Sequence, residues 1–156
     1  MSYGTVEGVA SYARTWTRGG QFYDASEYPS VSPTKPTLSE VENWLSEISG
    51  AFDLALENEG FVVPVTSAIA PNSYKQLTMK VETLTADLCA YANGLGRLYT
   101  DRALERGSLT IGNQEINDWV KNHITGLVND GVPRSLPQNE SRGGFSVSPQ
   151  RRGPNV

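Results

Sequence analysis

The stretch TLSEVENWLSEISGAFDLALEN, residues 37–58, carries the clearest structural signal in the chain. Thr37 is followed three residues later by Glu40, the spacing of a capping box, whose side chains satisfy free N–H groups at the start of a helix. Gly60 suits the left-handed backbone position that ends many helices. The stretch therefore predicts an amphipathic helix that ends near Asn58. Its apolar residues recur at steps of three and four, which places them on one face: Leu38, Val41, Trp44, Leu45, Ile48, Phe52, Ala55 and Leu56.

A second apolar run begins after Asn72 with a spacing close to a heptad rhythm. It comprises Leu77, Val81, Leu84, Leu88, Tyr91, Leu95 and Leu98. This spacing favours one long central helix that continues to Leu98. Gly94 and Gly96 interrupt the run, and each costs about 1 kcal/mol relative to alanine inside a helix. They mark either a kink or a place where another helix approaches closely.

The third long helix is expected to begin at Asn113, which can cap it, and to stop at Gly131. Its apolar face would comprise Ile116, Trp119, Val120, Ile124 and Leu127. A short helix is also expected near the N-terminus, where Thr5 can cap the sequence VEGVASYAR. Three main helices and one short helix thus predict an all-α fold, a small helical bundle.

Residues 15–36 break this helical pattern with three prolines and a Gly-Gly pair. A connection of this length is unusual inside a compact domain, and it contains four aromatic residues, including Phe22, Tyr23 and Tyr28. A solvated linker seldom carries so many aromatic side chains. We expect this early loop to pack on its own domain or against a neighbouring subunit, with these three residues as candidate contacts.

The 156 residues divide into an acidic helical domain, residues 1–131, and a basic extended tail, residues 132–156. The first part holds nine Lys and Arg against sixteen Asp and Glu, a net charge of −7, and the second holds four Arg against one Glu, a net charge of +3. An acidic body disfavours extensive contact with nucleic-acid phosphates. The chain contains neither a signal-peptide pattern nor an apolar stretch of roughly 20 residues, so we expect neither secretion nor a membrane partner.

Catalytic and metal-binding signatures are lacking in the sequence. His123 has Asp118 and Glu115 within two helical turns, but a surface histidine near a helix C-terminus is the simpler interpretation. Cys89, the only cysteine, sits beside an apolar position and fits a buried filler better than a nucleophile. We therefore expect no enzyme activity, no catalytic residue, no cofactor and no metal site.

The tail has its own pattern within SRGGFSVSPQRRGPNV, residues 141–156. Phe145 and Val147 alternate with serines, the period of a strand that could add to the edge of a sheet in a partner protein. Arg151 and Arg152 follow, and could bind acidic groups of that partner. The alternative is a tail that makes no contact at all.

Four segments, in order, are similar to the head-to-tail adaptor, or connector, proteins of long-tailed double-stranded DNA bacteriophages. They are YGTVEGVASYARTWT, PTLSEVENWLSEISGAFDLALENEGFVVPV, YANGLGRLYTDRALERG and QEINDWVKNHITGLVNDGVPR, and the resemblance covers about residues 3–134. It implies a structural protein of the virion neck, assembled in the host cytoplasm as a ring of typically about twelve identical subunits.

Such a ring would lie beneath the portal protein, extend the channel through which DNA passes without specific binding, and meet a stopper or tail protein on its other side. The tail would then contact the portal or, alternatively, an adjacent subunit. A different class of function stays open from the residues alone: a monomeric helical module that docks onto a partner protein for binding or regulation.

Overall fold

The computed structural model describes residues 2–94 and 108–135 of the chain. Its elements, in order, are α1 (Val6–Tyr12), the 3-10 helix η1 (Arg14–Trp16), β1 (Ser26–Glu27), β2 (Ser30–Val31), α2 (Leu38–Asn58), α3 (Pro71–Ala92), α5 (Ser108–Asn122) and α6 (Ile124–Asn129). The expected all-α class is confirmed, with one two-stranded sheet as the exception.

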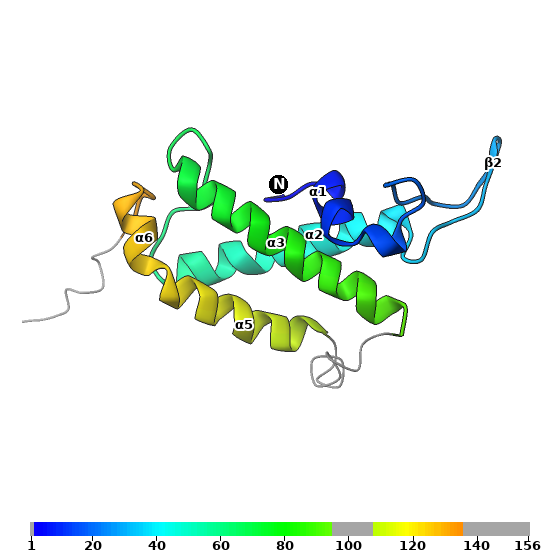
Figure 1. Cartoon of the computed structure of the whole chain (residues 1–156). Coiled ribbons are helices and arrows are strands. Elements are labelled where there is room, and N and C mark those ends of the chain that lie inside the picture. Colours follow the sequence, from blue (N-terminus) through cyan, green and yellow to red (C-terminus); the bar gives the residue numbers. More distant parts are fainter. Residues whose placement is uncertain (1, 95–107, 136–156) are drawn as a thin grey trace, which may run out of the picture.

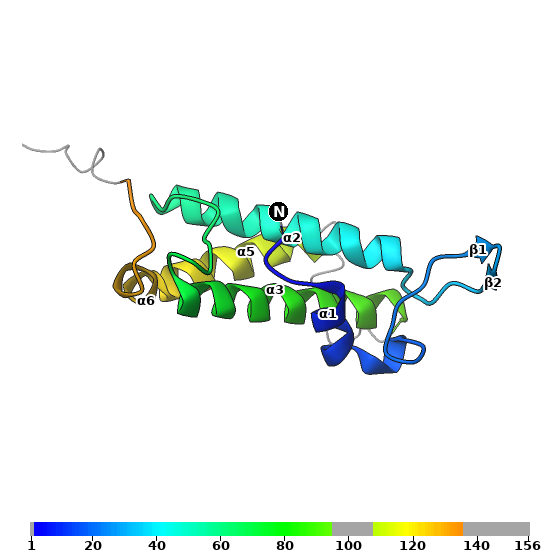
Figure 2. The same ribbon diagram turned by 90° about the horizontal axis from the view of Figure 1, so that it is seen from above.

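The three long helices α2, α3 and α5 lie side by side and form an elongated bundle (Figures 1 and 2). The short helix α1 packs across α2 and α3, and α6 turns away from the far end of α5. The β1–β2 hairpin projects from the end of the bundle opposite α6 (Figure 1).

Helix α2 begins and ends where the sequence predicts. The Thr37 hydroxyl accepts a hydrogen bond from the Glu40 N–H at 3.2 Å and donates one to the Glu40 carboxylate at 3.1 Å. At the other end Gly60 adopts φ +88°, and the Phe61 N–H reaches back to the Leu56 carbonyl at 3.0 Å. This is a Schellman ending, which satisfies carbonyls that the helix leaves without partners.

Helix α3 is shorter than predicted, because it ends at Ala92 and does not continue to Leu98. Gly94 adopts φ +78°, which ends the helix, and no atom of residues 2–94 and 108–135 lies within 4 Å of a β-carbon built on it. The Asn93 side-chain amide reinforces this end by donating to the carbonyls of Cys89 at 2.9 Å and Lys35 at 2.7 Å. Gly96, Leu95 and Leu98 lie outside the described residues.

The predicted last helix is two helices, and it begins earlier than Asn113, at Ser108. The interruption falls at His123. Its Nδ1 atom lies 2.7 Å from the Trp119 carbonyl oxygen, and its ring stacks on the Trp119 indole with the ring centroids 3.9 Å apart. The His123 N–H bonds instead to the Val120 carbonyl, three residues back. The helix therefore tightens and breaks before α6 starts. Helix α6 ends at Asn129, and Gly131, the expected stop, follows two residues later with φ +93°.

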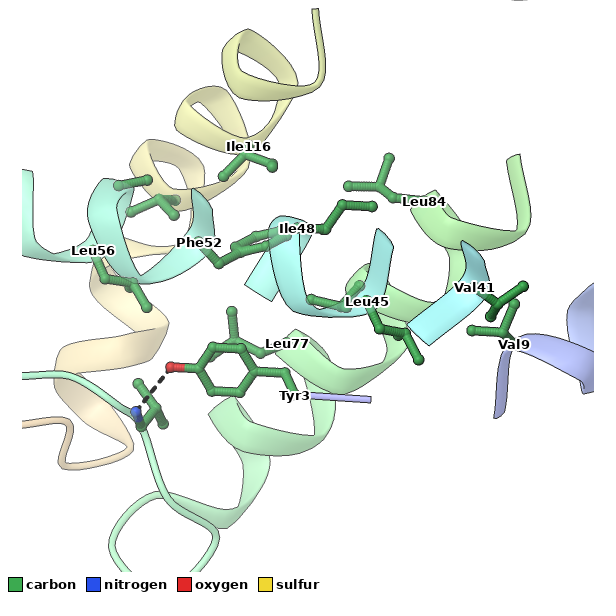
Figure 3. Close-up of a cluster of buried hydrophobic side chains, with 14 of the residues drawn as sticks. Tyr3, Val9, Val41, Leu45, Ile48, Phe52, Leu56, Leu77, Leu84 and Ile116 are labelled. Atoms are coloured by element: carbon green, nitrogen blue, oxygen red, sulfur yellow. Dashed lines mark hydrogen bonds between the residues drawn. The ribbon is translucent and has the colours of Figure 1, made fainter. Parts of the chain in front are cut away.

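The hydrophobic core runs along the bundle axis (Figure 3). Predicted core residues that are buried comprise Leu45, Ile48, Phe52, Leu77, Val81, Leu84 and Val120. Trp44, Leu88 and Trp119 pack against this cluster but stay partly exposed. Phe52 and Trp119 meet edge to face with ring centroids 5.5 Å apart, which joins α2 to α5.

Tyr3 anchors the N-terminal segment in the core, a role that the sequence did not indicate. Its ring is buried, and its hydroxyl donates to the Asp53 carboxylate while accepting the Val65 N–H at 3.0 Å (Figure 3). Burial is the main cause that raises the pKa of Tyr3 above its usual value. The phenol therefore stays protonated and joins α2 to the connection between α2 and α3.

Candidate protein-interaction surface

Residues 17–36 form an arm that leaves the bundle and returns to it, with the β1–β2 hairpin at its tip. The base of the arm is closed by hydrogen bonds between Tyr23 and Thr34, from the Thr34 N–H to the Tyr23 carbonyl at 3.0 Å and from the Tyr23 N–H to the Thr34 hydroxyl at 2.8 Å. The Arg18 guanidinium lies over the Tyr23 ring, 4.5 Å from its centroid, and donates to the Ser32 carbonyl at 2.7 Å. The base of the arm is therefore held in place by hydrogen bonds and by a cation–π contact.

Two contacts join the arm to the bundle. The Asp24 carboxylate accepts from the N–H and the hydroxyl of Ser39, in the first turn of α2, at 2.9 and 2.7 Å. These bonds, the backbone one first, hold the pKa of Asp24 below its usual value of 3.8. On the return strand, the Lys35 carbonyl accepts from Asn93 at the end of α3. One root of the arm is therefore held by α2 and the other by α3.

The tip of the arm extends into solvent. In the hairpin Ser26 lies opposite Val31 and Glu27 opposite Ser30, and neither strand pairs with any further strand among residues 2–94 and 108–135. Tyr28, in the turn between the strands, is 92% exposed. An aromatic ring held in water at the end of a supported arm is a typical anchor for a protein partner.

The three aromatic residues predicted as contacts in this segment have different environments. Phe22 is buried in the core of its own domain, Tyr23 is half-buried at the base of the arm, and only Tyr28 is fully available. The segment therefore packs on its own domain at its base and extends outward at its tip. Phe145, Val147, Arg151 and Arg152, the candidate contacts in the tail, lie outside the described residues.

A hollow lies beside the base of the arm, between α1, the arm and the start of α2. Its apolar lining comprises Val6, Ala10, Phe22 and Leu38. Its charged lining consists of the carboxylates Glu7 and Glu42, with Gly20 and Gln21 completing the rim. An apolar floor with acidic sides suits a basic segment that also carries apolar atoms.

The solvent face of α2 carries several carboxylates. Glu42, Glu47 and Glu57 are exposed on it, and the 21 residues of α2 include no lysine or arginine. Gly50 and Leu54 lie between these carboxylates, and Leu54 is 60% exposed. This face therefore presents negative charge without compensating cations on the same helix.

The residues considered for chemistry in the sequence have the following partners. Glu115 forms an ion pair with Lys80 at 2.9 Å, and the Nδ1 atom of His123 lies 2.7 Å from the Trp119 carbonyl oxygen. Cys89 is buried, and burial raises the pKa of its thiol to about 12. Across residues 2–94 and 108–135, no three metal-ligating side chains converge.

None of the helices in the described part of the chain is both long enough and apolar enough to span a bilayer. Asp24, Glu7 and Glu42 are the site residues that the sequence did not reveal. Asp24 is bonded to Ser39 only once the arm has folded, and Glu7 and Glu42 line one hollow only because α1 packs beside α2. Comparison with models of known protein families, with curated proteins and with solved structures found no match.

Proposed function

We propose that this chain is a structural subunit of a bacteriophage neck. Identical copies form a ring beneath the portal of the filled head, extend the DNA channel and link the head to a stopper or tail protein. The proposal rests on the ordered resemblance of residues 3–134 to head-to-tail adaptors, and three features of the described residues support it.

The first feature is that the molecule has two different ends. The arm projects beyond the start of α2, whereas Ser135, where the described chain stops, is bonded to the Gly60 carbonyl beyond the end of α2 at 2.7 Å (Figure 1). A ring of identical subunits requires heterologous contacts, in which one patch meets a different patch on the next copy. An elongated subunit with an arm at one end and a tail leaving the other fits that requirement.

The second feature is the charge of the body. Residues 1–131 carry a net charge of −7, and the exposed face of α2 holds carboxylates without cations. Facing a channel, such a surface repels the phosphate backbone, so DNA can slide through without sticking. We therefore assign the part of this face that carries Glu47 and Glu57 to the lumen.

The third feature, the strongest structural support for the proposal, is the exposed tip of the arm. A two-stranded hairpin is only marginally stable in isolation, yet this one is held away from the bundle with Tyr28 in solvent. Such a structure gains stability once another chain covers it. In the neck, that chain is a neighbouring subunit or the portal.

Co-assembly with the portal protein encoded in the same genome tests this function. The purified chain is mixed with purified portal rings, and the complexes are separated by sedimentation and viewed by electron microscopy. A second ring of density on one end of the portal is the expected result. Portal rings that stay bare at saturating concentrations of the chain would contradict the proposal. In that event, light scattering of the chain with candidate host proteins would test the monomeric binding module instead.

A further inference from the structure

The tip of the arm offers an open sheet edge. Within residues 2–94 and 108–135, strand β1 pairs with β2 on one side only, so its other edge has no strand partner there. An exposed strand edge is a template for one more strand. Because the strands contain two residues each, a third strand would stabilise the hairpin as a whole.

The sequence of β2 occurs a second time in the chain. Residues 30–33 read Ser-Val-Ser-Pro, and residues 146–149 in the tail read Ser-Val-Ser-Pro as well. Each copy follows an aromatic residue closely, Tyr28 in the arm and Phe145 in the tail. The tail therefore carries a duplicate of the segment that already pairs with β1 inside the arm.

The register of β2 indicates what the tail copy would meet on β1. With Val31 opposite Ser26 and Ser30 opposite Glu27, the equivalent arrangement sets Val147 opposite Ser26. Phe145 then falls opposite Tyr28, the exposed ring of the turn. Cross-strand aromatic pairs of this kind stabilise sheets relative to alanine pairs.

The same register brings the basic end of the tail to the acidic hollow. Arg151 and Arg152 follow Val147 by four and five residues, and Phe22 and Gln21 precede Ser26 by the same steps. Phe22 and Gln21 line the hollow whose charged residues are Glu7 and Glu42. Arg18, a cation of the same arm, is directed at Tyr23 and the Ser32 carbonyl. In this register two arginines would therefore meet two carboxylates.

Chain length favours a neighbouring copy as the source of this strand. The tail leaves from Ser135 beside Gly60, and the arm lies past the other end of α2, whose 21 residues span about 30 Å at about 1.5 Å per residue. The 11 residues from Ser135 to Ser146 reach about 36 Å when fully extended at about 3.3 Å per residue. The tip lies further still, beyond residues 32–37 of the arm (Figure 2). Spanning α2 alone would use most of this reach, so an adjacent copy is the favoured source of the strand.

We infer that residues 146–149 of one copy add as a third strand to the open edge of β1 in an adjacent copy. Phe145 packs on Tyr28, and Arg151 and Arg152 bind Glu7 and Glu42 in the hollow. This inference rests on the proposed ring, in which it supplies the contact between identical subunits, and it assigns the tail to the neighbouring subunit and not to the portal.

Disulfide trapping tests the contact directly. Cys89→Ser first removes the only native thiol. One preparation then carries Ser26→Cys and a second, of different mass, carries Val147→Cys, and the two are mixed and oxidised. Opposed residues of adjacent strands have Cα atoms about 4.5–5.5 Å apart, within disulfide range. We expect hybrid dimers at least tenfold above a control mixture in which Ser46→Cys, on the exposed face of α2, replaces Ser26→Cys.

Two proline variants test whether strand pairing causes the hybrid dimers to form. Ser146→Pro in the Val147→Cys chain removes a backbone donor inside the repeat and should reduce the hybrid to the control level. Ser141→Pro, in the same tail but outside the repeat, should leave the yield unchanged. A hybrid yield equal to the control, or one that Ser146→Pro does not lower, overturns the inference. A chain carrying both Ser26→Cys and Val147→Cys that closes on itself, while mixed chains form no hybrid, overturns it too.

These results are independent of the test of the neck function, because no portal is present in the trapping experiment. Portal binding without hybrid dimers would leave the neck function standing and refute the contact between tail and arm. Hybrid dimers without portal binding would support the contact between tail and arm and refute the neck function.

Discussion

The carboxylate of Glu82, on α3, lies directly against the backbone of Gly8, on α1. A β-carbon built on Gly8 would overlap the Glu82 carboxyl group, and one built on Gly4 would come within 2.6 Å of Glu82 Cγ. The buried carboxylate also accepts the Thr5 N–H at 2.9 Å, at the start of α1. The absence of side chains at two glycines therefore lets α1 sit on α3.

We expect Gly8→Ala to lower the free energy of unfolding by about 1–3 kcal/mol, the usual effect of overpacking a tight contact. The matched control is Gly50→Ala on α2, where nothing lies within 4 Å of the added methyl group. That variant should be neutral or more stable by up to about 1 kcal/mol, since alanine is the better helix former. Urea titrations of both variants measure the difference, and equal stabilities would contradict the close packing at Gly8.

The core predicts a second pair of variants on one helix. Phe52 is fully buried and packs on Trp119, whereas Leu54, two residues further along α2, is 60% exposed. Phe52→Ala should lower the free energy of unfolding by about 3–5 kcal/mol, while Leu54→Ala should change it by less than about 0.5 kcal/mol. Thermal melting followed by circular dichroism distinguishes them, and a large loss for Leu54→Ala would mean that α2 faces the core differently.

Stability should fall in acid because two carboxylates bind N–H groups at helix starts. The Ser73 N–H donates to Asp130 at 2.7 Å, and this bond, with the Ser73 hydroxyl and Asn72, holds the pKa of Asp130 below its usual value of 3.8. A carboxyl whose pKa is lower when folded contributes stability above its unfolded pKa and loses it as pH falls toward the folded value. Asp24 acts in the same direction at the start of α2.

We therefore expect the urea midpoint to be steady near neutral pH and to drop below about pH 4. In Asp130→Asn, which keeps an oxygen acceptor but not the charge, that drop should be shallower. A profile for Asp130→Asn that parallels the parent through this range would show that the carboxylate charge does not stabilise α3.

Tyr28 gives the prediction for assembly. Tyr28→Ser should leave the melting temperature unchanged, because the ring contacts solvent, but it should reduce incorporation into portal complexes. Tyr12→Ser serves as the control, since Tyr12 is also exposed, at 50%, but lies on α1. Phe22 is unsuitable for this purpose, because its removal would damage the core. Normal incorporation of Tyr28→Ser would exclude the arm tip from the interface.

Deleting residues 141–156 should leave a soluble domain with an unchanged melting temperature, since the described core is closed by Val132. The deleted chain should no longer form the assemblies of the full chain, as measured by light scattering and by portal co-sedimentation. Assembly at full strength would show that the tail is dispensable.

Local signals explain what the sequence predicted. The bounds of α2 depend on Thr37 and Gly60, residues that act on the backbone beside them, and both ends were located correctly. The start of α1 at Thr5 and the end of α6 just before Gly131 follow the same logic. In each case one residue either bonds to free backbone groups at the end of the helix or adopts a conformation that ends it. Contacts from distant parts of the chain are not needed.

Contacts made by individual side chains explain what the sequence did not predict. Gly94 ends α3, and Asn93 reinforces that end by bonding to the carbonyl of Lys35, 58 residues away. The break at His123 accompanies its stacking on Trp119, a local contact that apolar spacing does not reveal. The sequence did not predict the β1–β2 hairpin of the arm, because strands of two residues are too short to show an alternation of polar and apolar side chains. Its acidic hollow combines Glu7 with Glu42, which only the packing of α1 beside α2 brings together.

The orientation of the arm depends on how the helices of the bundle pack. Because Asp24 is fastened to α2 and Lys35 to α3, the direction in which the arm points is fixed by how these two helices are set against each other. In a closed ring, neighbouring copies are related by about 30° for twelve members and about 28° for thirteen. A tilt of only a few degrees between α2 and α3, transmitted through these roots, would then decide how many copies close the circle.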